Sequence, residues 1–219
     1  MGSAYRRAAL ENTRCLIAVY RGRADAALAD LQAGLARLER ADGSLGLKNH
    51  FRATLARAFH QLGDIQSARQ HLQTAIDYFE QIQFNIELPA LYRLQARILL
   101  SAEKPVEAEA AAQCALILAR ELNLQFDIGR TLCVLGDIAV ESQQLAQAGA
   151  YLEQALSILH NIGGEFAWAQ AQYSLARLRM AEGQYAAVAQ ALDVCIPIFE
   201  RLDAVIDLVA ARALREELT

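Results

Sequence analysis

The sequence contains few residues that interrupt helices and no strong excess of charge of either sign. Its 219 residues include 3 prolines and 12 glycines, while 54% of the residues are hydrophobic. A disordered chain has far fewer apolar residues, so the composition favours an ordered, helix-rich protein. The formal net charge of −4 argues against general nucleic-acid binding, which requires a basic surface.

Long apolar segments are also missing. A membrane-spanning helix needs an apolar run of about 18 residues or more, whereas the longest candidate, residues 110–119, is interrupted by Gln113. Glu11 ends the apolar part of the N-terminal segment too early for a secretory signal. We therefore expect a cytoplasmic protein without a membrane partner.

Side chains that support catalysis or metal binding do not cluster in the sequence. The cysteines show no CxxC spacing, which predicts buried, reduced thiols, and the histidines form no HExxH pattern. Gly163-Gly164 follows an expected helix rather than a strand, so it is not a phosphate-binding loop. These absences predict a non-enzymatic protein without a cofactor or a metal site. The cysteines are Cys15, Cys114, Cys133 and Cys195.

What the chain does contain is a repeated arrangement of small residues. The segment from Leu55 to Tyr78 reads as two amphipathic helices joined by a turn at Gly63-Asp64, and four other segments share its layout. Three columns of equivalent positions, 40 or 41 residues apart, hold Ala, Gly or Cys at 14 of 15 places. The columns are Cys15, Ala56, Ala96, Gly136 and Ala176; Ala27, Ala68, Ala108, Ala148 and Val188; and Gly34, Ala75, Ala115, Ala155 and Cys195.

These small residues predict close helix packing. Two helices approach to the short end of the usual ~8–10 Å range only when the side chains at their contact are small. A single helical hairpin cannot bury its own apolar face, whereas stacked hairpins bury a continuous core. The spacing therefore predicts an array of helical hairpins.

The array resembles a known family. The pattern Leu55-Ala56, Phe59, Gly63, Ala68, Leu72 and Ala75 is similar to the tetratricopeptide repeat (TPR), as is the pattern Leu135-Gly136, Ala148, Leu152 and Ala155. The family repeat has about 34 residues, so this chain would be a 40-residue variant, and HEAT repeats of about 40 residues remain an alternative. The resemblance implies an all-α fold, a right-handed α-solenoid of about five hairpins.

The repeats are expected at residues 5–40, 47–83, 86–122, 126–162 and 165–202, followed by a capping helix at 203–218. Residues 1–3 are expected to be a cloning remnant, and residues 4–219 to form a single repeat domain cut from a longer protein. A loop is expected at residues 41–46, and Gly163 fits a left-handed helix cap. Pro197 should kink or end the last helix of the fifth repeat, because it removes a backbone hydrogen bond. The C-terminal stretch 199–218 loosely resembles the TPR ends of large bacterial signalling ATPases or cyclases.

The family resemblance also implies a binding surface. In TPR proteins the first helix of each hairpin lines a concave groove, and its second, fifth, ninth, twelfth and thirteenth positions face that groove. In this chain those positions hold five arginines but only the carboxylates of Asp137 and Glu141. The candidate peptide-binding residues are Asn12, His50, Arg57, His60, Arg93, Arg97, Arg130, Tyr173 and Arg177.

This basic lining in an acidic protein suggests a function. The hypothesis is a protein–protein interaction module whose groove binds an acidic or carboxylate-ending peptide, since the planar guanidinium group matches a carboxylate. It would be part of a larger bacterial regulatory protein. Alternatives are a self-association scaffold that forms a homo-oligomer, a sensor for a small anionic ligand, and arginines that only pair with their neighbours and keep the groove soluble.

Overall fold

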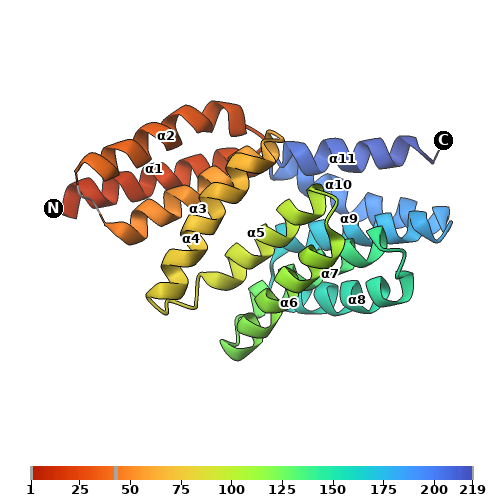
Figure 1. Ribbon diagram of the computed structural model, residues 1–219. Coiled ribbons are helices and arrows are strands. Elements are labelled where there is room, and N and C mark those ends of the chain that lie inside the picture. Colours follow the sequence, from red (N-terminus) through yellow and green to blue (C-terminus); the bar gives the residue numbers. More distant parts are fainter. Residues whose placement is uncertain (1, 42–43, 219) are drawn as a thin grey trace.

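The protein is an all-α solenoid of helical hairpins. The computed structural model describes residues 2–41 and 44–218, and these residues form eleven helices and no strand (Figure 1). Five hairpins follow one another, and a single helix ends the chain. The helices are α1 (Gly2–Tyr20), α2 (Ala24–Arg40), α3 (Leu45–Gln61), α4 (Ile65–Gln81), α5 (Leu88–Ser101), α6 (Pro105–Glu121), α7 (Gln125–Glu141), α8 (Leu145–Asn161), α9 (Glu165–Ala181), α10 (Tyr185–Arg201) and α11 (Val205–Glu216).

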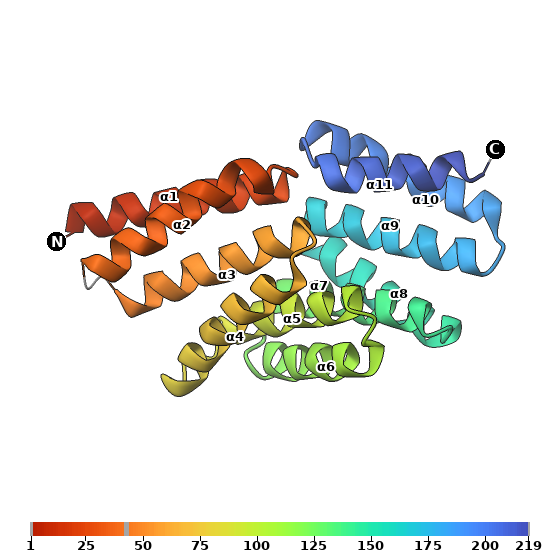
Figure 2. The same ribbon diagram turned by 45° about the horizontal axis from the view of Figure 1, so that its top comes forward.

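The helices form two layers. Successive odd-numbered helices contact one another from α1 to α11, and each even-numbered helix packs against the odd-numbered helices before and after it. The odd-numbered helices therefore form one continuous wall. The ribbon curves as the hairpins stack, and the even-numbered helices α4, α6 and α8 lie along its outer edge (Figures 1 and 2).

The small residues of the three columns lie at the helix contacts. All fifteen are buried, and most have no exposed surface at all. At Gly136 on α7, a Cβ atom would lie 2.6 Å from Cδ2 of Leu152 on α8. The helices thus approach so closely that a methyl group at this position would overlap its neighbour, which is the physical reason for the column.

The turns between helices share one geometry. The second residue after each of the helices α1 and α3–α10 has a positive φ, and the next amide donates to the carbonyl five residues back, as from Gly164 to Leu159 (3.0 Å). This is the left-handed helix cap. The expected cap at Gly163 is confirmed, with φ of 70°.

The solenoid curves far enough that its first hairpin meets its last helix. Arg23, in the turn after α1, donates to the carboxylate of Asp203 before α11 at 3.1 Å. A Cβ atom on Gly22 would lie 3.1 Å from Cγ1 of Ile206. The rings of Tyr20 on α1 and Phe166 on α9 have centroids 6.4 Å apart. In both ribbon views the end of α1 lies beside the start of α11 (Figures 1 and 2).

One expectation about helix bounds is wrong. The expected loop at 41–46 is shorter, because α3 already begins at Leu45. The hydroxyl of Ser44 accepts a hydrogen bond from the amide of Leu47 at 3.5 Å. Met1 and residues 42–43 and 219 lie outside the described residues. Helix α10 contains Pro197 and continues to Arg201, so of the two expected effects of the proline, a kink or an end of the helix, the end does not occur. Pro197 and Asp193 both lie on the exposed face of α10, where water can solvate the carbonyl group that lost its partner.

The cysteine prediction holds for three of the four thiols. Cys15, Cys133 and Cys195 are buried and free, whereas Cys114 is free but exposed on α6. The correction has a simple cause. Cys114 precedes the small-residue column at Ala115 by one position, so it points away from the helix contact that buries Ala115.

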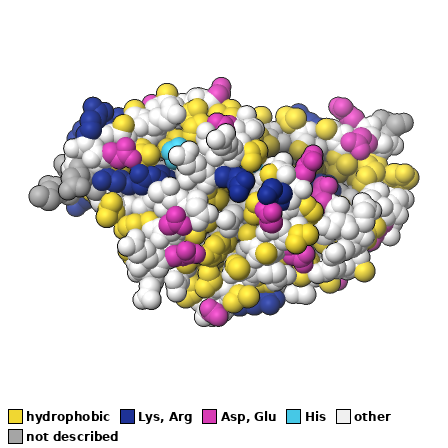
Figure 3. All heavy atoms as spheres, in the orientation of Figure 1, with side chains coloured by type: hydrophobic (Ala, Val, Ile, Leu, Met, Phe, Trp, Pro, Cys, Tyr) yellow, Lys and Arg dark blue, Asp and Glu magenta, His cyan; other side chains and the backbone are white. Residues whose placement is uncertain are grey.

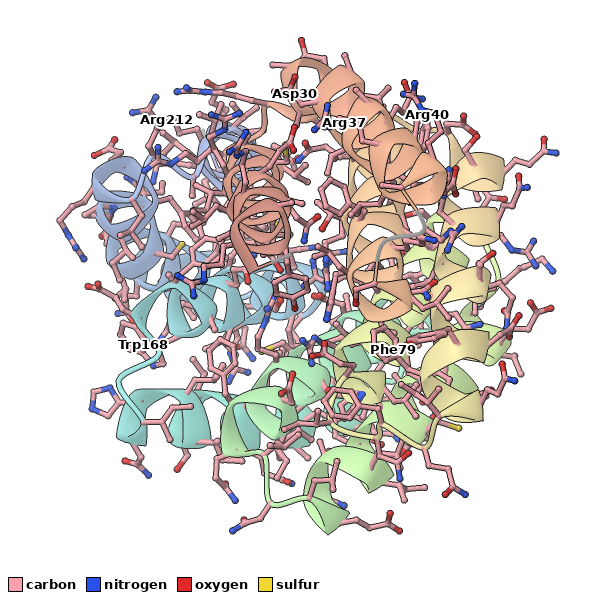
Figure 4. The ribbon with its side chains drawn as sticks, turned by 90° about the vertical axis from the view of Figure 1, so that its left-hand side faces the viewer. Asp30, Arg37, Arg40, Phe79, Trp168 and Arg212 are labelled. Atoms are coloured by element: carbon pink, nitrogen blue, oxygen red, sulfur yellow. The ribbon has the colours of Figure 1, made fainter. Side chains whose placement is uncertain are left out.

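Charged side chains are spread over the surface of the molecule. Basic and acidic side chains are interspersed with apolar ones on the face in Figure 3, rather than gathered in one basic area. Viewed from the α1–α2 end, Phe79 lies among the helices, while Asp30, Arg37 and Arg40 lie on the outer edge (Figure 4). None of the described helices is both long enough and apolar enough to span a membrane.

Candidate functional site

The inner wall of the solenoid forms a cavity of about 270 Å³ that is open to the surface. Every odd-numbered helix contributes to its lining: Val19 and Tyr20 from α1, Arg57, His60 and Gln61 from α3, Arg93, Leu94 and Arg97 from α5, Arg130 from α7, Gln170 from α9, and Ile206 and Asp207 from α11. The cavity exists because the solenoid curves round until α11 faces α1. We call it the arginine cavity.

The arginines of this cavity are of two kinds. Arg93 is buried and donates to the carboxylate of Asp127 at 2.7 Å and to the hydroxyl of Thr131 at 3.4 Å. The other three, Arg57, Arg97 and Arg130, have no carboxylate within 4.0 Å of their nitrogen atoms among the described residues. Their charges are therefore not neutralised by direct ion pairs inside the described structure.

Tyr20 lies between two of these unpaired charges. The guanidinium carbon of Arg57 is 5.9 Å from the Tyr20 ring centroid, and that of Arg130 is 6.0 Å from it. At these distances the ring attracts both cations. Arg130 also lies 5.6 Å from the ring centroid of Phe126. The aromatic rings stabilise the arginines without removing their charge.

The pKa values of the lining residues report on the electrostatic potential in the arginine cavity. The charge of Arg57 lowers the pKa of the Tyr20 phenol to about 7, with Arg130 acting in the same direction and burial opposing both. Burial lowers the pKa of Arg57, and burial, followed by the charge of Arg97, lowers the pKa of His60. The cavity thus favours negative charge and disfavours further positive charge.

Three further lining residues supply hydrogen-bonding groups to the arginine cavity. Gln170 donates to the carboxylate of Asp207 at 2.9 Å, and burial raises the pKa of Asp207. Gln61 donates to the carbonyl oxygen of Val19 at 2.9 Å, while its own Oε1 atom is buried without a partner among the described residues. A buried acceptor without a donor is unfavourable, so a ligand N–H group would be stabilised there.

The structure brings five of the nine candidate residues together. Arg57, His60, Arg93, Arg97 and Arg130 all line the arginine cavity, and His60 also makes a hydrogen bond of 2.8 Å with the hydroxyl of Ser101.

The remaining four candidates lie elsewhere. The ring centroid of His50 lies 5.3 Å from that of Phe79 on α4, and Asn12 lies near the middle of α1 with its Oδ1 atom buried and unpartnered among the described residues. Arg177 on α9 pairs with Asp137 on α7 at 3.2 Å and with Glu141. Tyr173 packs against the apolar core between α9 and α10. Arg177 and Arg93 therefore form ion pairs with neighbouring carboxylates, which is the alternative in which these arginines only keep the groove soluble.

Sequence reasoning missed the contribution of the terminal helix. It treated α11 only as a cap, yet Ile206 and Asp207 on this helix complete the arginine cavity. It did not select Tyr20 either, although that residue occupies a groove-facing position of the first repeat. No local pattern marks Asp207, because its place depends on the curvature summed over five hairpins.

Two other surface hollows are less suited to binding a charged ligand. One of about 910 Å³ lies along α1 and α2, where Arg37 donates to Glu11 across the hollow at 2.6 Å. Another of about 530 Å³ lies between α4 and α5 and is lined mainly by glutamines and apolar residues. Neither contains a group of unneutralised charges, so the arginine cavity is the candidate site.

Comparison with known protein families matches two parts of the chain. The tetratricopeptide repeat model matches residues 50–82 and 129–158, which lie on the α3–α4 and α7–α8 hairpins. Both this match and the solenoid fold support the tetratricopeptide-repeat family. The small-residue columns and the left-handed turns are thus features of TPR-like hairpins in this chain.

Solved structures share this TPR-like fold. A Rap protein crystallised with competence and sporulation factor matches with a TM-score of 0.82 and 17% identity, covering 94% of this chain and 57% of that one. A putative kinesin light chain with TPR-like repeats from Podosopora anserina matches with a TM-score of 0.62 and 17% identity, covering 96% of each chain. BtubC from P. vanneervenii matches with a TM-score of 0.57 and 16% identity, covering 92% of this chain and 89% of that one. No curated protein sequence matches the chain.

Proposed function

We propose that this chain is a protein–protein interaction module that binds an acidic segment of a partner in the hollow of its solenoid. The observation that carries the proposal is the convergence of Arg57, Arg97 and Arg130, from three successive hairpins, without a carboxylate partner among the described residues. A guanidinium group offers a planar fork of donors that fits a carboxylate. The arginine cavity is therefore a receptor for a negatively charged group.

The energetics require several of these contacts to act together. A single exposed ion pair contributes only about 0–1 kcal/mol, whereas a micromolar complex needs about −8 kcal/mol. Charges that are partly buried, as those of Arg57 and Arg130 are, interact more strongly than exposed ones because less water screens them. Micromolar binding therefore requires the three arginines and apolar contacts along the groove to act together.

The comparisons support a larger regulatory context. The Rap protein was crystallised with competence and sporulation factor, and this chain spans 57% of the Rap protein's length. We infer that the chain is a 40-residue-repeat variant of the TPR fold within a larger bacterial regulatory protein, and that it acts in the cytoplasm without catalysing a reaction.

The proposal is tested by fluorescence anisotropy with labelled ten-residue peptides. A panel on a Gly/Ser background would carry an internal Glu-Glu pair, the Gln-Gln equivalent, or a free or amidated C-terminus. Acidic peptides are expected to bind at least about tenfold more tightly than their neutral equivalents, with an affinity that falls as salt is added. Equal affinity for acidic and neutral peptides would reject the proposal.

A second candidate is a sensor for a small anionic metabolite. The volume of the arginine cavity, about 270 Å³, favours this alternative, because a small molecule would fill such a space. Thermal melting with organic acids and nucleotides distinguishes the two. A metabolite that raises Tm progressively with its concentration favours the sensor, since binding to the folded form stabilises it by mass action.

The ionisation of Tyr20 is expected to make acidic-peptide binding depend on pH. With a pKa of about 7, the phenol loses its proton as pH rises and then supplies a negative charge beside Arg57, Arg93 and Arg130. A carboxylate ligand competes with that phenolate, so affinity is expected to fall about tenfold between pH 6 and pH 8. Anisotropy titrations across this range measure the change. In Tyr20→Phe the dependence should disappear; a dependence of the same size in that variant would assign it to other groups.

A further inference from the structure

A second cavity adjoins the arginine cavity. It has a volume of about 440 Å³ and is lined by Ile17, Tyr20 and Arg21 of the first hairpin, Phe126 and Arg130 of α7, Phe166 of α9, and Leu202 and Ala204 before α11. Its lining is mainly apolar and aromatic. We call it the apolar cavity.

The two cavities share a wall. Tyr20 and Arg130 line both of them, and the Arg130 guanidinium lies over the rings of Tyr20 and Phe126. The phenol of Tyr20 is near the arginines, and its ring forms a T-shaped pair with the ring of Phe166, which lines the apolar cavity. A ligand that reaches Arg130 from the arginine cavity is therefore within one side-chain length of the apolar cavity.

The apolar cavity is open to a ligand. Ile17 is 48% exposed and Phe126 is 45% exposed, although both are large apolar side chains. Exposed apolar side chains are stabilised when an apolar group covers them, and these two lie beside the guanidinium group of Arg130, which forms no direct ion pair among the described residues. The charge beside them requires that the covering group carry, or be next to, a negative charge.

Resting on the proposed function, we propose that the ligand is a peptide in which a carboxylate and a large apolar side chain lie on the same or adjacent residues. The carboxylate binds Arg57, Arg97 and Arg130, and the apolar side chain enters the apolar cavity against Ile17 and Phe126. The carboxylate comes either from an acidic side chain or from a free C-terminus, because both present the same group to the arginines.

The acceptors of the arginine cavity favour a peptide over a fatty acid. Gln61, whose Oε1 atom has no partner among the described residues, and Asp207, which carries a carboxylate, both line the arginine cavity. A peptide has backbone N–H groups that can donate to these atoms, whereas a fatty acid has none. The site thus combines donors for a carboxylate, acceptors for backbone amides and an apolar compartment.

The test compares ten-residue peptides on one Gly/Ser background. The pairs are an internal Phe-Glu against Ala-Glu, and a C-terminal Phe against a C-terminal Ala, each with a free carboxylate and with an amide. Burying a phenyl ring is expected to strengthen binding roughly 10- to 100-fold. The arm in which phenylalanine matters identifies the source of the carboxylate, whether a side chain or the C-terminus.

Substitutions in the apolar cavity test whether it causes the preference for phenylalanine. Ile17→Ala combined with Phe126→Ala should reduce the preference for phenylalanine, measured as the ratio of the affinities for the Phe-Glu and Ala-Glu peptides, to less than about threefold. Because the Phe126 ring also packs against Arg130, the affinity for the Ala-Glu peptide is expected to fall as well, and only the ratio reports on the apolar cavity. Val106→Ala is the matched control, because Val106 is 81% exposed on α6 and lines neither cavity. Its preference should equal that of the unmodified chain.

The outcomes separate this inference from the function on which it rests. If acidic peptides bind but alanine and phenylalanine peptides bind equally, the apolar compartment is refuted and the proposed function stands. If the phenylalanine preference persists in the Ile17→Ala/Phe126→Ala variant, the compartment is wrongly placed and the inference also fails. If none of the acidic peptides binds, both the proposed function and this inference are overturned.

Discussion

Replacing Arg57 and Arg97 together by glutamate is expected to weaken the binding of an acidic peptide by at least about 100-fold. Hydrogen bonds to charged groups contribute roughly 1.5–3 kcal/mol each when partly buried, and the new carboxylates also repel the ligand. Two such contacts account for a loss of about 2.7 kcal/mol or more, which is a factor of about 100. Fluorescence anisotropy with an acidic peptide measures the effect.

The variant is expected to fold, so the loss can be assigned to the site. A glutamate at position 57 would lie close to the cations Arg93 and Arg130, which would stabilise it. Arg40→Glu combined with Arg120→Glu is the matched control, because both arginines are exposed and the change in net charge is the same. Unchanged affinity in the Arg57/Arg97 variant, or an equal loss in the control, would show that the arginine cavity does not bind the acidic group.

The second large effect concerns stability. Replacing Gly34 by alanine is expected to destabilise the fold by about 1–3 kcal/mol, even though alanine is the better helix former. An added Cβ atom would lie 2.4 Å from Cε1 of Phe51, whose ring is completely buried between α2 and α3. The helices must separate to accommodate the methyl group. For a chain of this length, Tm should fall by roughly 2–12 °C in thermal melting followed by circular dichroism.

Gly149 provides the control. It also lies inside a helix, α8, but the nearest neighbour of an added Cβ atom is Cδ2 of Leu178 at 3.8 Å, an ordinary contact. Gly149→Ala should therefore stabilise the protein by up to about 1 kcal/mol through helix propensity alone. Opposite signs for the two substitutions support the close packing of α2 on α3. A gain in stability from Gly34→Ala would contradict it.

The repeat architecture could be predicted from sequence because it depends on local spacing. The columns that contain Ala68, Ala75 and Gly136 report contacts between helices that are neighbours in the chain, so a 40-residue period is enough to place them. The turns follow similarly from the helix ends, as at Gly163. Arg57, Arg93, Arg97 and Arg130 also follow from this register, because equivalent positions of successive first helices face one side.

The contact between the two ends of the solenoid could not be predicted from sequence, because it depends on the curvature summed over all the hairpins. The contact of Arg23 with Asp203 joins residues 180 positions apart, and a small change in curvature per hairpin would separate them. Asp207 and the apolar cavity depend on the same closure. His50 shows a different limit, since its position in the register was groove-facing but its ring packs near Phe79 on α4. The position of a residue in the repeat predicts the helix face on which it lies. The side-chain rotamer then determines which neighbouring residue it contacts.

Crystallographic analysis of the chain with its tightest-binding acidic peptide tests the central claim most directly. The account predicts a peptide carboxylate within hydrogen-bonding distance of the guanidinium groups of Arg57, Arg97 or Arg130, inside the cavity that α1 and α11 close. A peptide bound on the outer layer of α4, α6 and α8, or in the hollow along α1 and α2, would contradict it.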